Sequence, residues 1–135
     1  DVQAHSHMTL WSMMAAPLLT SHDLASTGEF DRRLLTNPEI LAINQDELGV
    51  QARKVSPRFR PWVLAKPLVD GSMAVSITNM GRRSRRVRVP LSQVGWHGTA
   101  QVRDVWRMQD VGRLDRLDVE LGPFASVAYV CRRTG

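Results

Sequence analysis

The residues of this chain that could bind a metal or act as a nucleophile are few and widely separated. The 135 residues include four His and one Cys, and the closest pair among these five residues is His5 and His7. Residues two apart on a helix point to different faces, whereas helical ligand pairs are three or four apart. Packing explains this pair better, so we expect neither a metal nor a cofactor. The single Cys131 excludes an internal disulfide and fits a small buried side chain.

A polar turn at residues 21–23 follows the short apolar run 18–20, which suits a fully buried strand. The apolar residues of segment 2–16 recur on nearly every side of a 3.6-residue wheel, which predicts a buried helix. Pro17 separates this helix from the strand, because the residue before a proline disfavours helical geometry. The order predicted for this part is helix, strand and polar turn.

Two more helices are expected before Gly49, after which the spacing of the apolar residues changes. Ser26 or Thr27 can cap the first of them, and Asn37 can cap the second, with Pro38 at its first position and its end near Gly49. A buried strand needs neighbouring strands and covering helices, which these elements cannot supply alone. Because the chain also begins with Asp1 rather than Met, we expect a processed or truncated piece of a larger α/β protein.

After Gly49 the spacing of apolar residues falls to about 2, the period of β-strands. Asp70-Gly71 between two apolar runs predicts a tight hairpin. The fold class predicted is therefore α/β followed by all-β, with an antiparallel β-sandwich in the second part. Seven short strands are expected, at residues 50–55, 62–64, 73–78, 85–89, 100–106, 114–121 and 127–131.

Charge divides the chain into two unlike parts. Residues 1–52 carry a balance of −5 and residues 53–135 one of +10, which favours either a nucleic-acid or membrane surface or two separate structural units. The longest apolar stretch, 13–19, is far shorter than the roughly 20 residues that span a bilayer. We therefore expect no membrane partner.

Five arginines lie between Arg82 and Arg88, but no aromatic residue lies between Trp62 and Trp96 to stack on bases. Alternation of arginine with valine over residues 85–89 fits a strand with one solvated and one buried face. We therefore expect no nucleic-acid partner.

Two apolar clusters and one polar cluster have alternative interpretations. Trp62, Trp96 and Trp106 could form a sugar-stacking platform, although packing explains them better. Core packing also explains the cluster formed by Trp11, Met13 and Met14. The side chains of residues 44–46 could grip a ligand, but satisfying backbone groups where a helix ends against the β part is the better explanation.

Several runs resemble glycoside hydrolase family 27, the α-galactosidase and α-N-acetylgalactosaminidase family. They are residues 10–19, 21–24, 42–49, 62–68, 70–75 and 102–106. The resemblance implies that residues 1–51 are the last βα portion of a (β/α)8 catalytic barrel and residues 52–135 a C-terminal antiparallel β-sandwich. It places the final barrel strand near residues 17–20, between helices at 2–16 and 26–36, with a further helix at 38–46.

The family hydrolyses terminal α-D-galactosidic bonds with retention, using one carboxylate as nucleophile and another as acid/base. The resemblance implies that these two aspartates lie upstream of Asp1, so this chain alone is expected to be inactive. Active sites of such barrels lie at the C-terminal ends of the strands, which makes Ser21, His22 and Asp23 candidate substrate-binding residues at the rim. Location outside the cytoplasm is suggested by the resemblance only.

The resemblance leaves galactose, N-acetylgalactosamine and β-L-arabinopyranose open as the recognised sugar, and it does not fix the oligomeric state. A different class of function also stays open, a stand-alone non-catalytic β module that binds carbohydrate or a partner protein. A basic nucleic-acid-associated domain is a third and weaker alternative.

Overall fold

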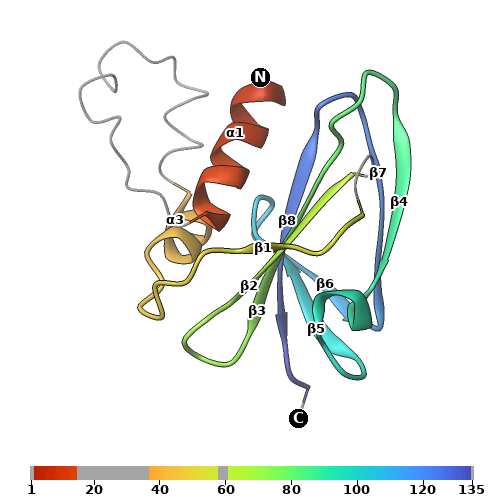
Figure 1. Cartoon of the computed structure of the whole chain (residues 1–135). Helices are drawn as coiled ribbons and strands as arrows, with labels where there is room; N and C mark the ends of the chain where they lie inside the picture. The colour runs from red at the N-terminus through yellow and green to blue at the C-terminus, as the bar shows by residue number, and fades with distance from the viewer. Residues whose placement is uncertain (1, 15–36, 58–60, 135) are drawn as a thin grey trace, which may run out of the picture.

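The computed structural model describes residues 2–14, 37–57 and 61–134, which lie in three layers (Figure 1). A six-stranded sheet is the middle layer, and a two-stranded sheet covers one of its faces. Helices α1 (Val2–Met13) and α3 (Pro38–Asn44) lie on the opposite face. The middle sheet is therefore covered on both sides.

The described residues form eight strands and one 3-10 helix, η2 (Leu91–Val94). The six-stranded sheet has the order β1-β2-β3-β8-β5-β6, the second sheet pairs β4 with β7, and every pairing is antiparallel. The predicted antiparallel sandwich is confirmed. The strands are β1 (Arg53–Lys54), β2 (Trp62–Pro67), β3 (Met73–Thr78), β4 (Arg85–Pro90), β5 (Ala100–Asp104), β6 (Gln109–Leu114), β7 (Arg116–Leu121) and β8 (Ser126–Arg132).

Two apolar cores form on the two faces of the middle sheet, because successive side chains of a strand point to opposite faces. In β2, Val63 and Ala65 belong to the core between the sheets, whereas Leu64 belongs to the core under the helices. A strand covered on both faces has a nearly continuous buried run, which is the pattern of residues 63–66.

The prediction of a single strand at 114–121 is wrong. The chain leaves the middle sheet at the end of β6, bends at Asp115 and enters the two-stranded sheet as β7. Strand β6 was not predicted, because it is an edge strand whose residues are exposed or half-buried, so it has no alternation of apolar and polar side chains.

Other predicted strand bounds need smaller corrections. The strand expected at 100–106 ends at Asp104, where residues 105–108 form the turn into β6. The strand expected at 50–55 is reduced to Arg53–Lys54. In contrast, residues 73–78 form β3 as predicted.

Helix α1 ends at Met13, earlier than the predicted residue 16, and Met14 lies in a turn. Helix α1 is not buried all round, since Val2 is 50% exposed and Gln3 and His7 are also exposed. The strand expected at 17–20 and the helix expected at 26–36 lie outside the described residues. In the described part of the chain, no helix is long and apolar enough to span a membrane.

Helix α3 begins as predicted. Asn37 is its N-cap and accepts hydrogen bonds from the backbone N–H groups of Glu39 and Ile40, at 3.0 and 3.1 Å. Pro38 occupies the first turn, where a missing N–H costs nothing. The helix ends at Asn44, two residues before the end at 46 that the resemblance implies and five before Gly49, where the spacing of apolar residues predicted its end.

The predicted hairpin at Asp70-Gly71 connects β2 to β3. Gly71 has φ +87°, a conformation that favours glycine. The Asp70 carboxylate accepts hydrogen bonds from the N–H and hydroxyl of Ser72, which lower the pKa of that carboxyl. This turn holds the two strands in the register that pairs Leu64 with Ser76.

Cys131 provides a chemical test of the core between the sheets. Its side chain is fully buried, and burial raises the pKa of its thiol to about 12. Because only the thiolate reacts, we expect Ellman's reagent at pH 8 to leave the native chain unlabelled and to label it stoichiometrically in urea. Rapid labelling of the native chain would contradict this packing.

Candidate functional site at the helix–sheet junction

The junction between the helices and the middle sheet is centred on a fully buried lysine, Lys66. Its Nζ donates to the Ile43 carbonyl oxygen at 2.6 Å and to the Ser12 carbonyl oxygen at 3.4 Å. These two acceptors belong to the last turns of α3 and α1, where carbonyl groups lack helical partners. One ammonium group therefore caps the C-terminal ends of both helices.

The position of Lys66 follows from the alternation along β2. Lys66 is two residues after Leu64, so both point to the helix-covered face. Burial lowers the pKa of its ammonium group, and the negative charge of Asp46 opposes this shift. The partial negative charge at the two helix ends also favours a cation there. Sequence reasoning missed this residue, although a lysine inside a buried apolar run was the available signal.

Asp46 joins the end of α3 to the hairpin between β2 and β3. Its Oδ1 accepts from the backbone N–H groups of Leu48 and Val69, each at 3.0 Å, and Oδ2 lies 3.2 Å from the Val69 nitrogen. The Asn44 side-chain amide donates to the Trp11 carbonyl oxygen at 3.4 Å. The interpretation of residues 44–46 as groups that satisfy the backbone at this helix end is therefore confirmed for these two side chains.

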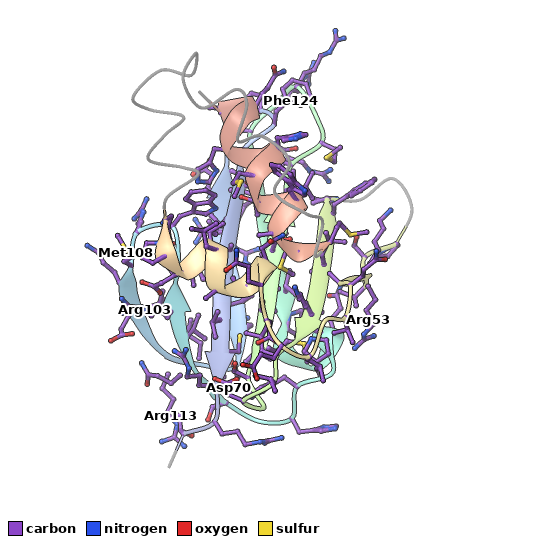
Figure 2. The ribbon with its side chains drawn as sticks, turned by 90° about the vertical axis from the view of Figure 1, so that its left-hand side faces the viewer. Arg53, Asp70, Arg103, Met108, Arg113 and Phe124 are labelled. Atoms are coloured by element: carbon purple, nitrogen blue, oxygen red, sulfur yellow. The ribbon has the colours of Figure 1, made fainter. Side chains whose placement is uncertain are left out.

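The other end of α3 is fixed to the turn after β5. While its Oδ1 caps the helix, the Asn37 Nδ2 donates to the carbonyl oxygens of Val105 and Trp106, at 3.3 and 3.4 Å. Arg103 of β5 forms two hydrogen bonds with the Glu39 carboxylate, at 2.7 and 3.1 Å. Arg103 is labelled in Figure 2, beside α3 on the sheet face that the helices cover.

Arg103 also connects α3 to the edge of the sheet. Its Nη1 lies 3.1 Å from the Asp110 carboxylate of β6, and its Nη2 donates to the Met108 carbonyl oxygen at 2.9 Å. The two carboxylates raise the pKa of this guanidinium above its usual range. Met108 has φ +53°, so the arginine holds a turn with unusual backbone geometry.

Helix α1 meets the sheet through short polar side chains. The Thr9 hydroxyl accepts from the Trp106 Nε1 at 2.8 Å and from the Ser126 hydroxyl at 3.1 Å. The Ser6 hydroxyl donates to the carbonyl oxygen of Phe124, which has φ +58°. Small residues on this face let the helix approach the strands closely enough for these direct hydrogen bonds.

Of the two histidines of α1, only His5 packs against the sheet. The His5 ring lies 4.1 Å from the Trp106 ring between centroids, and its Nδ1 is 3.4 Å from the Ser126 hydroxyl oxygen. Burial lowers the pKa of His5, which the Asp104 charge opposes. His7 is exposed and lies near Trp11. Across the described ranges, no three His, Cys, Asp or Glu side chains are grouped to hold a metal.

The three tryptophans do not form a common platform. Trp96 is buried between the sheets, Trp106 packs under α1, and Trp62 is partly exposed beside Lys54. Met13 is buried in the core under the helices and Trp11 packs against that core, whereas Met14 is exposed. The candidate rim residues Ser21, His22 and Asp23 lie outside the described residues.

The junction is thus a set of structural hydrogen bonds that anchors two helices on the outer face of a β-sandwich. Residues 1–46 match the family model described as alpha galactosidase A, and residues 60–131 match the alpha galactosidase C-terminal beta sandwich domain. The chain therefore belongs to the α-galactosidase family, glycoside hydrolase family 27.

Curated relatives include plant α-galactosidases. The enzyme from Oryza sativa subsp. japonica is 30% identical over 132 residues, which is 96% of this chain and 32% of that protein. The α-galactosidase of Coffea arabica is 39% identical over 103 residues, which is 75% of this chain and 27% of that protein. The chain thus spans about a third or less of the length of these relatives.

Solved structures show the same arrangement. A GH27 β-L-arabinopyranosidase from Geobacillus stearothermophilus superposes with a TM-score of 0.90 at 27% identity, over 99% of this chain and 31% of that one. The α-galactosidase I of Mortierella vinacea superposes with a TM-score of 0.88 at 16% identity, over 97% of this chain and 36% of that one, and supports the fold alone.

Replacement of Lys66 tests the junction. Lys66→Met keeps most of the buried volume but leaves the Ile43 and Ser12 carbonyl groups without this donor. An unsatisfied buried group costs about 1–3 kcal/mol, so we expect urea unfolding to show a loss of that order. The control is Lys54→Met on exposed β1, which loses only the contact of its ammonium group with the Trp62 ring at 4.9 Å and should cost less than about 1 kcal/mol. Equal effects of the two substitutions would contradict the cap.

The pH dependence of the same variant gives an independent readout. Burial lowers the pKa of Lys66 below its ordinary 10.5 in the folded state, so the unfolded chain binds more protons between the lowered value and 10.5. The free energy of unfolding contributed by this group therefore rises with pH in that window. We expect the difference in free energy of unfolding between the wild-type chain and Lys66→Met to grow as pH rises through this window.

Asn37 allows its two roles to be separated. Asn37→Ser keeps a good N-cap but is too short to reach the Val105 and Trp106 carbonyl groups, whereas Asn37→Ala loses both functions. We expect both variants to be less stable than the wild type, with Asn37→Ala lower than Asn37→Ser by about 1 kcal/mol. Equal thermal stability of Asn37→Ser and the wild type would show that the hydrogen bonds donated by the Asn37 Nδ2 do not contribute to stability.

Proposed function

We propose that this chain is the C-terminal part of a retaining glycoside hydrolase that cleaves terminal α-D-galactosidic bonds. The observation that carries the proposal is that both parts of the chain match α-galactosidase family models. Residues 1–46 match the alpha galactosidase A model, and residues 60–131 match the sandwich domain model. The α-galactosidase names of the plant relatives support the same substrate class.

In this proposal, residues 1–51 complete the catalytic barrel and residues 52–135 form the domain that supports it. The catalytic aspartates then lie in the part of the enzyme that precedes Asp1. The 135-residue chain binds no substrate productively by itself, because a retaining enzyme needs two carboxylates roughly 5 Å apart across the sugar. Lys66, Asn37 and Arg103 act as positioning residues, since they hold α1 and α3 on the sheet.

Ser21, His22 and Asp23 belong to the proposal as rim residues. The resemblance places them after the last barrel strand, at the end where such barrels bind substrate. Their replacement by alanine in the full-length enzyme should raise KM more than it lowers kcat if they only bind sugar hydroxyls. None of them serves as nucleophile or acid/base.

The test compares the 135-residue chain with the full-length product of its gene. We expect p-nitrophenyl α-D-galactopyranoside to be hydrolysed only by the full-length product, with α-galactose as the first sugar product by NMR, because the mechanism retains configuration. The same assay with p-nitrophenyl β-L-arabinopyranoside and p-nitrophenyl N-acetyl-α-galactosaminide compares the other two sugars that the family recognises.

Each alternative gives a different result in this test. Activity of the 135-residue chain alone would contradict the upstream location of the catalytic pair. Preferential hydrolysis of the arabinopyranoside would replace the proposed substrate by that of the Geobacillus relative. Saccharide binding without any hydrolysis by the full-length product would favour the non-catalytic β module.

A further inference from the structure

A notch of about 350 Å³ opens where strand β5 ends, beside helix α1. Strand β5 ends at Asp104, which pairs with Tyr129, so the first residues of β8 extend beyond it. The residues that line the notch come from α1, from the end of β5 and the turn after it, and from the start of β8: His5, Asp104, Trp106, Arg107, Ser126 and Val127. Its volume lies at the lower end of the range of small-molecule pockets, about 300–1,000 Å³. The notch therefore has room for one small molecule.

The hydrogen bonds around Thr9 fix which ring nitrogen of His5 carries a proton. The Thr9 hydroxyl donates to the His5 carbonyl oxygen at 2.9 Å. Its oxygen accepts from the Trp106 Nε1 at 2.8 Å and from the Ser126 hydroxyl at 3.1 Å. A hydroxyl has only one proton to donate, so Ser126 has none left for the His5 Nδ1, which is 3.4 Å away. His5 therefore carries its proton on Nδ1 and donates it to Ser126.

The other ring nitrogen of His5, Nε2, is left as an acceptor without a partner. Burial lowers the pKa of His5, so the ring is neutral at about pH 8 and has a single proton. With that proton on Nδ1, Nε2 keeps its lone pair, and no group in the described part of the chain bonds to it. Because polar groups that are shielded from water normally have a partner, this half-buried acceptor is available to a ligand in the notch.

The two charged side chains of the notch have opposite signs and can form further hydrogen bonds. The Arg107 Nε lies 3.9 Å from the Asp104 Oδ2, and the Asp104 Oδ1 accepts from the Arg107 backbone N–H at 3.0 Å. A carboxylate has about four acceptor positions and a guanidinium has five N–H donors, so both groups keep unused capacity. One negative group, one positive group and a neutral imidazole favour an uncharged ligand that both donates and accepts hydrogen bonds.

The Trp106 ring supplies an apolar wall. Its centroid lies 4.1 Å from that of the His5 ring, and its Nε1 already donates to Thr9, so only its apolar surface remains for a ligand. The negative face of an aromatic ring attracts weakly positive C–H groups. A ligand with several hydroxyl groups beside a C–H face matches this set of side chains, and a pyranose ring has both.

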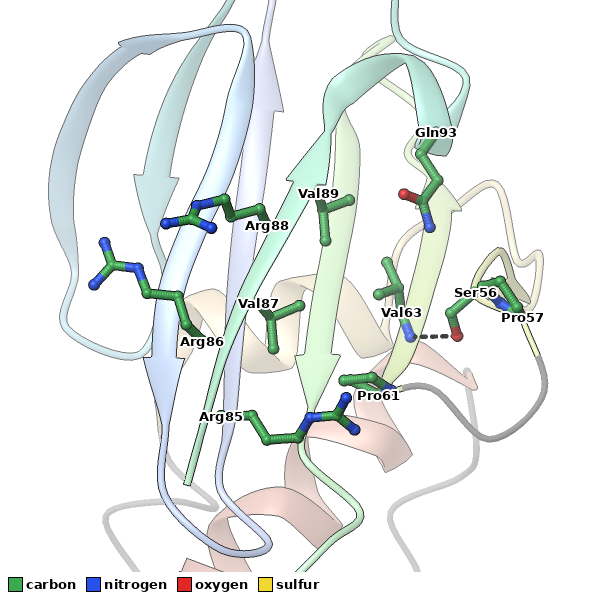
Figure 3. A pocket seen from close by; sticks show the side chains of 10 residues that line it. All are labelled: Ser56, Pro57, Pro61, Val63, Arg85, Arg86, Val87, Arg88, Val89 and Gln93. Atoms are coloured by element: carbon green, nitrogen blue, oxygen red, sulfur yellow. Dashed lines mark hydrogen bonds between the residues drawn. The ribbon is translucent and has the colours of Figure 1, made fainter. Parts of the chain in front are cut away.

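The groove along β4 (Figure 3) has a similar volume, about 370 Å³, but its groups are engaged in the fold. Val63, Val87 and Val89 belong to the core between the sheets. The Ser56 hydroxyl accepts from the Val63 N–H at 3.1 Å, and the Gln93 amide donates to a backbone carbonyl oxygen at 3.3 Å. The notch, in contrast, combines an acceptor without a partner, an aromatic wall and two charged groups with unused capacity.

We propose that the notch binds one pyranose ring of a neutral saccharide. Hydroxyl groups of the sugar donate to the His5 Nε2 and the Asp104 carboxylate and accept from the Arg107 guanidinium. The C–H face of the sugar covers the apolar surface of Trp106. The inference goes beyond the proposed hydrolase, which supplies only the choice of D-galactose as the probe.

The experiment follows the His5 ring by NMR in the full-length product of the gene, with its histidines labelled with nitrogen-15. Nitrogen chemical shifts distinguish protonated from bare ring nitrogens, and His5→Gln assigns the His5 signals. At about pH 8 without ligand, Nδ1 should be protonated and Nε2 bare. D-galactose should shift the Nε2 signal saturably, because a hydroxyl group then donates to its lone pair. His7 is on the same helix but does not line the notch, so its signals should not respond.

A pair of arginine variants tests whether the response comes from the notch. Arg107→Ala removes a charged donor and should raise the galactose concentration that gives half of the His5 shift at least about tenfold. Arg82→Ala is the matched control, because Arg82 is exposed, does not line the notch and forms no ion pair in the described part of the chain. It should change this concentration less than about twofold. Near-UV circular dichroism confirms that the variants are folded.

Several results would overturn the proposal. They are a protonated Nε2 in the free protein, a His5 signal that does not respond to galactose, and equal effects of Arg107→Ala and Arg82→Ala. A stronger response to acetate or to ethylammonium than to galactose would also overturn it, because the preferred ligand would then be charged. Failure of the proposed hydrolase function gives a different result: p-nitrophenyl α-D-galactopyranoside is not hydrolysed, while the His5 response to galactose remains.

Discussion

The arrangement of this chain depends on one buried ammonium group between two helices and a sheet. Lys66 is 0% exposed, and its Nζ reaches carbonyl groups of α1 and α3, which lie 54 and 23 residues away in sequence. Isolated buried charges are expensive, so this lysine stabilises the protein only while both helix ends supply their carbonyl oxygens. Correct docking of the helices and burial of the charge therefore require each other.

The two faces of the middle sheet are held by different kinds of interaction. The face between the sheets is apolar, and residues such as Ile77 and Val102 pack there without directional constraints. The face under the helices combines apolar packing with hydrogen bonds that Asn37 donates and that Asp46 and Thr9 accept. Directional bonds fix the position of a helix more narrowly than apolar contact does. Such a face is suited to holding α1 and α3 in one position on the sheet.

Local rules predicted much of this fold, and contacts between distant segments account for what was missed. The Asn37 cap, the Asp70-Gly71 turn and the buried Cys131 follow from neighbouring residues or from the period of a strand. Strand β6 has no such period, because it is an exposed edge. The pairing of Arg103 with Glu39 and the cap formed by Lys66 depend on packing of α3 against the sheet, which no local pattern contains. The predicted rim residues lie outside the described part of the chain.

Hydrogen exchange of the backbone amides tests this account most directly, in the wild type and in Lys66→Met. If one ammonium group couples both helix ends to the sheet, the substitution should reduce protection in the last turns of α1 and α3 together. Strands β3 and β8, which pair with each other over all six residues of β3, should keep their protection. Reduced protection in only one helix, or in neither, would contradict the central role of Lys66.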